Sequence, residues 1–221
     1  MEHYGIMYKS IKYLFGGVSM KKIFSILLLL GIMLILFGCT DKIISNEEHI
    51  KKSIEHYYSE SQPHNNGTLV IEQIKDFDNG YLVMTEKYSG EGHNFDDLFL
   101  MDSNYKITHV TRGYKPLSPC FSYNKLYHND KTILFGTFND TKWVPKTDSK
   151  VKVDIKEVYV EFENGESVFE KVNFENGYLI VLDGELETNK FEIYDDNKEL
   201  QAELDDTIAI FDDIKFKELK N

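Results

Sequence analysis

Arginine, tryptophan and cysteine are almost absent from this chain of 221 residues. Arg112 is the sole arginine, Trp143 is the sole tryptophan, and Cys39 and Cys120 are the two cysteines. Because bidentate recognition of phosphate and carboxylate groups relies mostly on arginine, its scarcity argues against an anion-binding site.

Recognisable catalytic motifs are missing as well. The chain contains no G-x-S-x-G nucleophile elbow, no H-E-x-x-H zinc motif, no phosphate loop and no G-x-G-x-x-G dinucleotide motif. None of the histidines that follow Cys39 pairs with another at metal-ligand spacing. These histidines are His49, His56, His64, His93, His109 and His128. We therefore expect no enzyme, no resident metal and no cofactor.

Basic residues are too few to balance the acidic ones. The chain has 25 Lys and Arg against 37 Asp and Glu, a formal net charge of −12 at pH 7. Such a surface disfavours nucleic acid and anionic lipid headgroups as partners. It is compatible with cationic ligands, although solubility alone explains the same composition.

The longest apolar run lies near the amino terminus. Ile23–Phe37 is apolar apart from Ser25 and Gly31, and two lysines precede it. A cationic start followed by an apolar core of about 7–15 residues describes a secretory signal, whereas a membrane-spanning helix needs about 20 apolar residues. The run is short for a permanent span, and an uncleaved anchor helix remains the alternative.

The end of this run is more specific than its hydrophobicity. Leu36-Phe37-Gly38-Cys39 resembles the lipobox of bacterial membrane lipoproteins, with Leu36, Gly38 and Cys39 matching the pattern. The resemblance implies cleavage before Cys39 and acylation of its sulfur. The mature chain would then be anchored to the lipid membrane through acylated Cys39, on the extracytoplasmic face of the cell membrane. Cys120 is expected to be a small buried apolar side chain, with a reactive thiol as the alternative.

These features divide the first 44 residues into three segments. Residues 1–19 do not resemble the start of a signal, and Gly16-Gly17 before Met20 suggests a ribosome-binding sequence, so we interpret them as an over-extended start. Residues 20–38 form the expected signal peptide. Residues 39–44 form the expected lipidated tether.

Residues 45–113 are expected to form an α+β unit, one helix on an antiparallel meander. Ser45-Asn46-Glu47-Glu48 has the form of a capping box, and apolar residues then recur at helical spacing, which predicts a helix over about 46–60. The predicted strands are Thr68–Lys75, Tyr81–Tyr88, Phe95–Met101 and Tyr105–Thr111.

Residues 114–120 are expected to be a linker, since Pro116 and Pro119 lack the N–H that a strand ladder needs. Residues 121–221 are expected to form an Ig-like β-sandwich, which makes the chain mainly β. The predicted strands are Lys131–Phe138, Val151–Phe162, Ser167–Phe174, Tyr178–Leu182 and Lys190–Tyr194. The apolar alternation shifts near Lys156-Glu157, which predicts a β-bulge. The tail Thr207–Leu219 is compatible with a strand or a short helix.

A short motif recurs along the chain. Phe77–Met84 and Phe174–Val181 nearly repeat each other, and Phe162–Gly165 repeats their first half. Each contains Asn-Gly between apolar segments, the signature of a tight hairpin turn, so we predict three hairpins rather than a repeat architecture.

Two places carry side chains that suit a ligand. Within Glu91–Asp97, the side chains of Glu91, His93, Asp96 and Asp97 could converge on a ligand or metal, although a polar loop has the same composition. Trp143 lies in Asn139–Lys146, which is expected to be a polar loop, and an exposed aromatic ring on a loop serves as a contact residue or as the lid of a core edge.

These observations predict a membrane-anchored binding or interaction module at the cell surface, with a protein or the cell wall as its partner. The first alternative is a structural or accessory component of an envelope assembly. An enzyme without a motif is the second, and it would show a pocket holding a histidine near a carboxylate of perturbed pKa.

Overall fold

The computed structural model describes residues 46–61, 67–88, 95–115, 120–144, 146–206, 210–211 and 214–219. The signal peptide, Cys39, the capping residue Ser45, His93 and the prolines of the expected linker lie outside these ranges. The chain divides into two compact units, Met1–Ile50 and Lys51–Asn221. The description below concerns the second unit.

The predicted helix is confirmed and extends over residues 46–61. Tyr57 and Tyr58, on its last turns, both contact Phe99 edge to face, with ring centroids 5.3 Å and 5.8 Å from it. Such aromatic pairs add to the stabilisation from buried area and attach the helix to the sheet beneath it. Within the described ranges, no helix is both long enough and apolar enough to cross a membrane.

The first sheet is the predicted antiparallel meander with one strand added. Its order is β1-β2-β3-β4-β15. The strands are β1 (Thr68–Phe77), β2 (Gly80–Tyr88), β3 (Phe95–Asp102), β4 (Ile107–Tyr114) and β15 (Lys217–Glu218). Residues 217–218 of the tail, for which a strand or a short helix was expected, form a short strand of this sheet.

The β1–β2 hairpin confirms the first Asn-Gly prediction, but its turn is shifted by one residue. Phe77 pairs with Gly80, so the two turn residues are Asp78 and Asn79, and Asp78 has a φ of 49°. Gly80 is already in the strand. A Cβ atom there would lie 1.9 Å from the carbonyl oxygen of Met101 on β3, so the glycine permits close strand approach.

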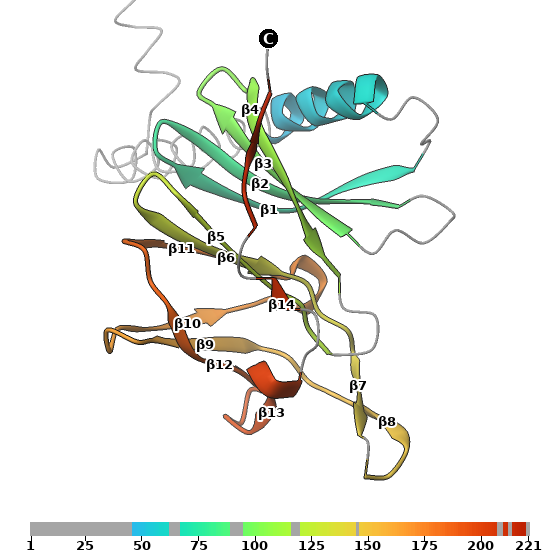
Figure 1. The fold of residues 1–221 in the computed structure, drawn as a ribbon. Helices are drawn as coiled ribbons and strands as arrows, with labels where there is room; N and C mark the ends of the chain where they lie inside the picture. The colour runs from blue at the N-terminus through green and yellow to red at the C-terminus, as the bar shows by residue number, and fades with distance from the viewer. Residues whose placement is uncertain are drawn as a thin grey trace, which may run out of the picture. The chain divides into compact units, whose positions relative to one another are not determined.

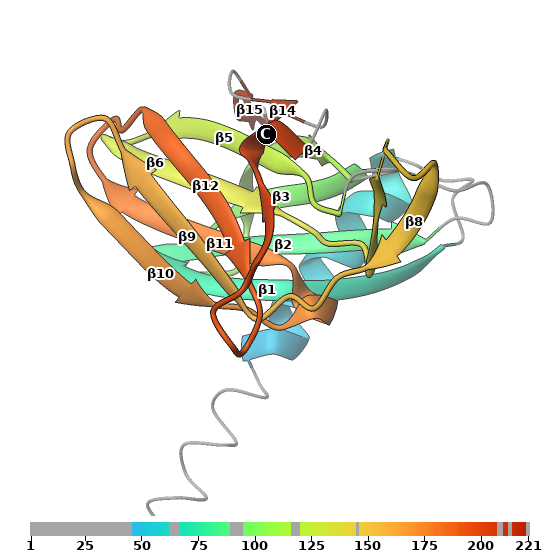
Figure 2. The ribbon, with the colours of Figure 1, turned by 90° about the horizontal axis from the view of Figure 1, so that it is seen from below.

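The second half is the expected sandwich of two sheets. The second sheet has the order β11-β6-β5-β14 and the third has the order β10-β9-β12-β13. The second sheet contains β5 (Tyr123–His128), β6 (Lys131–Gly136), β11 (Tyr178–Asp183) and β14 (Ile210–Phe211). The third contains β9 (Glu157–Phe162), β10 (Ser167–Lys171), β12 (Thr188–Tyr194) and β13 (Leu200–Glu203). A ribbon of β7 (Thr141–Val144) and β8 (Ser149–Lys152) projects beside them (Figure 2).

The second sheet is buried on both faces, because it lies between the other two (Figure 1). One face packs on the first sheet through side chains that include Leu126, Ile133, Phe135 and Leu179. The other face packs on the third sheet through Tyr123, Leu134, Tyr178 and Ile180, in a core that also contains Cys120. Alternate residues of one strand therefore serve two separate cores. The burial of Cys120, which is fully covered, agrees with the expectation for this thiol.

Segments that precede residues 114–120 and segments that follow them take part in the same core and in the same sheet. Leu82 and Leu98 of the first sheet belong to one core with Phe135 of the second, and Lys217 near the end of the chain pairs with Val110 of β4. The division at 114–120 remains a prediction about domains.

Two local predictions were wrong. Val151–Phe162 is not one bulged strand, because β8 ends at Lys152 and β9 begins at Glu157, with residues 153–156 outside any strand. Phe174–Gly177 is not a hairpin turn but a 3₁₀ helix, η1 (Phe174–Asn176), followed by Gly177 at a φ of 61°. It connects β10 of the third sheet to β11 of the second, and these two strands do not pair with each other. The third Asn-Gly, at Asn164-Gly165, does form the predicted β9–β10 hairpin.

Candidate functional site

Asp96 and Asp97, two of the residues selected from the sequence, lie side by side on β3 but face opposite ways. Successive strand residues point to opposite faces of a sheet. Asp96 is fully buried between the first and second sheets, whereas Asp97 faces the helix. The two carboxylates therefore cannot bind one ligand together, and each belongs to its own polar network.

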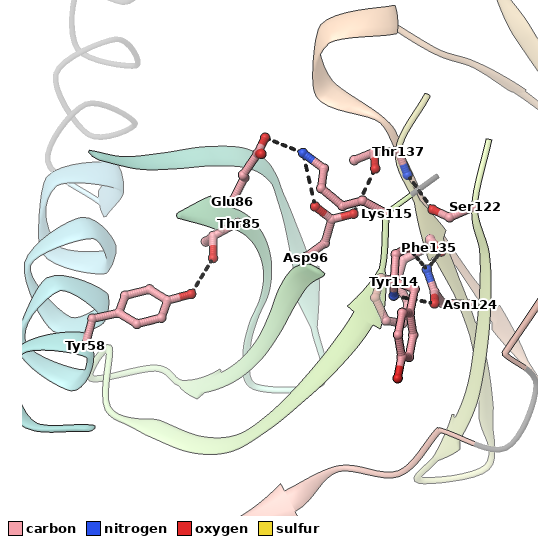
Figure 3. A network of polar contacts seen from close by, with 10 residues as sticks. All are labelled: Tyr58, Thr85, Glu86, Asp96, Tyr114, Lys115, Ser122, Asn124, Phe135 and Thr137. Carbon is pink, nitrogen blue, oxygen red and sulfur yellow. Dashed lines mark hydrogen bonds and ion pairs between the residues drawn. The ribbon is translucent and has the colours of Figure 1, made fainter. Parts of the chain in front are cut away.

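Asp96 belongs to an ionic cluster in the interior (Figure 3). The Thr137 hydroxyl donates to Asp96 Oδ2 over 2.9 Å, and Lys115 Nζ lies 3.6 Å from Oδ1. The same ammonium forms a shorter ion pair with Glu86 on β2. Lys115 thus bridges carboxylates from two neighbouring strands.

Glu72 adds a third carboxylate to the ionic cluster because β1 is irregular at this position. Ile71 pairs with Thr85 and Gln73 with Met84, so Glu72 is an extra residue in β1. A bulge of this kind redirects a side chain. Glu72 is 7% exposed, and its Oε2 atom has no hydrogen-bond partner, as is also true of Asp96 Oδ1.

Burial dominates the protonation of the ionic cluster. It raises the pKa of Glu72 to about 9, with further increases from the negative charges of Asp96 and Glu86. Burial also raises the pKa of Asp96 to about 7, although Lys115 and the Thr137 hydroxyl act in the opposite direction. Glu72 is therefore a neutral acid at pH 7, which explains how three carboxyl groups and one ammonium share a buried site.

The backbone that carries Lys115 is held by one buried amide. Asn124 on β5 donates from Nδ2 to the Phe135 carbonyl over 3.0 Å and accepts at Oδ1 from the Tyr114 N–H over 3.0 Å. A Cβ atom on Gly113 would lie 2.5 Å from Phe135, so only glycine allows this approach of β4 to the second sheet. These contacts hold the backbone so that the Lys115 side chain reaches the carboxylates of the ionic cluster.

Asp97 is the centre of the second network, on the helix side of the sheet. Arg112 lies directly opposite it on β4, and the guanidinium donates from Nε to Oδ1 over 2.7 Å and from Nη2 to Oδ2 over 3.3 Å. The hydroxyl of Tyr58 on the helix donates to Oδ2 over 2.6 Å. The hydrogen bonds to Asp97 hold the pKa of Arg112 above its ordinary value, so this fork carries a fixed positive charge.

An open hollow of about 390 Å³ lies beside this second network. We call it the Arg112 hollow. Among the residues described, its lining comes from the helix, β3, β4 and the segment 214–219, and includes Tyr57, Asp97, Val110, Thr111, Arg112, Lys215 and Lys217. Its volume falls within the range of about 300–1,000 Å³ that is common for small-molecule sites. None of the carboxylates of the ionic cluster lines it.

Trp143 lies elsewhere, in strand β7 rather than in the expected loop, where it pairs with Lys150 and is 45% exposed. The structure does not bring it together with Asp96 or Asp97, and His93 lies outside the described residues. Among the residues described, no group of three His, Cys, Asp or Glu side chains is arranged to hold a metal ion.

Several residues of both networks were missed from the sequence. Lys115, Glu72 and Glu86 carry no local signal, since each is a charged residue in an ordinary strand or loop context. Arg112 could have been placed opposite Asp97 if the register of the β3–β4 hairpin had been predicted. Comparisons of this chain with protein-family models, with curated proteins and with solved structures gave no match.

Proposed function

We propose that this protein is a lipid-anchored extracytoplasmic lipoprotein that binds a ligand at the cell surface through the Arg112 hollow. The lipobox-like residues Leu36–Cys39 support the anchoring. Acylation of Cys39 would tether the chain to the membrane, because a diacylated residue gives stable attachment where a single acyl chain does not.

The Arg112 hollow is the single observation that carries the binding role. It is concave, and Asp97, Arg112 and Tyr57 in its lining are held on paired strands and on a docked helix. Side chains fixed in this way bind with little loss of conformational freedom. The ionic cluster is a candidate for stability rather than binding, since its three carboxylates are almost completely buried.

The anchoring is tested by feeding an alkyne-tagged fatty acid to bacteria that produce the full chain. We expect the tag on the wild-type protein and on Cys120→Ala, which removes the other cysteine, but not on Cys39→Ser. Protease added to intact protoplasts should digest the protein. A tag that persists on Cys39→Ser, or full protection from protease, contradicts the anchoring.

The binding role is tested by thermal melts of the full chain in detergent against calcium, other divalent metals and soluble cell-wall fragments. A ligand at about 100 times its dissociation constant stabilises by about 2.7 kcal/mol, a shift of about 5–10 °C for a chain of this size. Tyr57→Ala should reduce that shift, and Phe169→Ala, an exposed change on the third sheet, should not. Absence of any shift, together with loss of another envelope protein in a deletion strain, would favour the structural alternative.

A further inference from the structure

The β7–β8 ribbon has a charge opposite to that of the chain as a whole. The chain carries a formal net charge of −12, yet residues 141–152 contain four lysines, Lys142, Lys146, Lys150 and Lys152, against one acidic residue, Asp148. Net charge is an average over the whole surface, whereas a partner responds to the field at the place where it binds. The acidic composition that disfavours anionic partners elsewhere therefore does not describe this ribbon.

The strand register places the sole tryptophan beside two of these lysines. Trp143 pairs with Lys150, and Thr141 pairs with Lys152. Residues directly opposite each other in an antiparallel pair point to the same side, as do residues two apart on one strand. Trp143, Lys150 and Lys152 therefore share one side of the ribbon, and all three are exposed. We call this side the Trp143 face.

The opposite side of the ribbon is attached to the third sheet. Lys142 points to that side, and its Nζ atom donates to the carbonyl of Gln201 on β13. At the base of the ribbon, the Val153 N–H donates to the Asp140 carbonyl over 3.0 Å. These contacts fix the ribbon with the Trp143 face directed away from β13, at the side of the sheets (Figure 2).

An exposed indole ring between ammonium groups suits the surface of a membrane. Tryptophan combines a large apolar ring with one N–H donor, and such rings gather at the boundary between lipid headgroups and acyl chains. Lysine side chains attract anionic phospholipids, and their methylene stems follow apolar surface while the charge stays among the headgroups. A soluble phosphate polymer would match the lysines but offers no apolar layer for the ring.

We infer that the Trp143 face docks on an anionic phospholipid membrane, with the ring at the boundary of the acyl chains and Lys150 and Lys152 among the headgroups. The inference goes beyond ligand binding in the Arg112 hollow, and it rests on the proposed anchoring for the membrane that the ribbon meets. An acyl anchor together with a basic patch is a known two-signal form of membrane attachment. A second contact of this kind orients the anchored protein on the membrane.

The test uses Trp143 as its own reporter, because no other tryptophan in the chain contributes to the emission. The full chain is reconstituted into vesicles of phosphatidylcholine, with or without phosphatidylglycerol. Bromine atoms on the acyl chains of these lipids quench a tryptophan that touches them. Lys150→Gln/Lys152→Gln removes two charges from the Trp143 face and keeps the ring. The matched control, Lys106→Gln/Lys171→Gln, removes two exposed lysines outside the ribbon.

In vesicles with phosphatidylglycerol, we expect the emission of the wild type and of the control to shift to shorter wavelength and to be quenched. The double variant Lys150→Gln/Lys152→Gln should lose about thirtyfold in the ratio of docked to undocked protein. Raised salt should also reduce the quenching, because exposed charges are screened over about 8 Å at physiological ionic strength.

Unquenched emission from the wild type overturns the inference. Equal quenching of the double variant, or equal quenching in vesicles without phosphatidylglycerol, overturns it as well. Binding of inorganic polyphosphate combined with unquenched emission in the vesicles would assign the lysines to a soluble polyanion instead of a membrane. Fatty-acid labelling of Cys39 does not depend on Trp143, so failure of the ribbon contact and failure of the anchoring are distinguishable.

Discussion

Removal of one hydroxyl at the helix–sheet contact gives the most direct test of the Asp97 network. Tyr58 is 2% exposed, and its O–H donates to a carboxylate that is itself only 7% exposed. Tyr58→Phe keeps the ring and its edge-to-face contact with Phe99 while it deletes the donor. Asp97 would keep the two hydrogen bonds from Arg112 but lose the one that reaches it from the helix.

The magnitude follows from the charge of the acceptor. A hydrogen bond to a charged group contributes about 1.5–3 kcal/mol, and after its loss the buried carboxylate of Asp97 keeps only the donors on Arg112. For a chain of this size, 1 kcal/mol corresponds to about 2–4 °C in melting temperature. Tyr58→Phe should therefore lower the melting temperature by about 3–12 °C.

The assay is thermal or denaturant unfolding of the two tyrosine variants under identical conditions. Tyr57→Phe is the matched control, because it deletes the same atom from the adjacent, partly exposed ring at the Arg112 hollow. We expect Tyr57→Phe to stay within about 0.5 kcal/mol of the wild type. If Tyr58→Phe costs no more than Tyr57→Phe, Asp97 does not depend on the helix and the reasoning fails.

Three further predictions concern other parts of the fold. Glu72 has a pKa of about 9 in the folded protein and about 4.5 in the unfolded chain, so the free energy of unfolding should fall as pH rises from about 5 to 9. Glu72→Gln should flatten that decline, and parallel curves of stability against pH for the two proteins would contradict the raised pKa of Glu72. Gly80→Ala places a methyl group against the Met101 carbonyl and should destabilise the protein by about 1–3 kcal/mol, more than Gly165→Ala, where φ is +86° but the space is open. Equal losses of stability in urea unfolding would show that the close approach of β3 does not require glycine at position 80. Trp143→Phe should remove all tryptophan fluorescence and change the free energy of unfolding by less than about 0.5 kcal/mol. A larger loss of stability in a thermal melt would mean that this ring covers the edge of a core.

Elements with a strong local pattern were predictable. The helix, the β1–β4 meander and the β9–β10 hairpin follow from periodicity and turn residues, and they appear within a few residues of the predicted bounds. β5 was missed because Asn124 and Lys125 make it look like a polar loop. Both are buried in the second sheet, where Lys125 forms an ion pair with Glu187, 62 residues away in the chain. A strand covered on both faces shows no alternation that a sequence pattern could reveal.

The candidate site was predictable only in part. Asp96 and Asp97 were selected from the sequence, but their separation onto two faces depends on the strand that contains them, and their partners depend on its register. Arg112 reaches Asp97 because β4 pairs with β3, Glu72 joins Asp96 because β1 has an extra residue, and Lys217 reaches β4 from the far end of the chain. No local signal encodes any of these three contacts.

The sequence by itself therefore determined the class of fold, the helix and two of the three Asn-Gly hairpins, because each is encoded in a short stretch by apolar spacing or by turn residues. Only the tertiary structure decided which charges meet. Pairing register, a bulge and the return of the chain's end bring together residues up to about a hundred positions apart, and burial then sets which of them keep their protons.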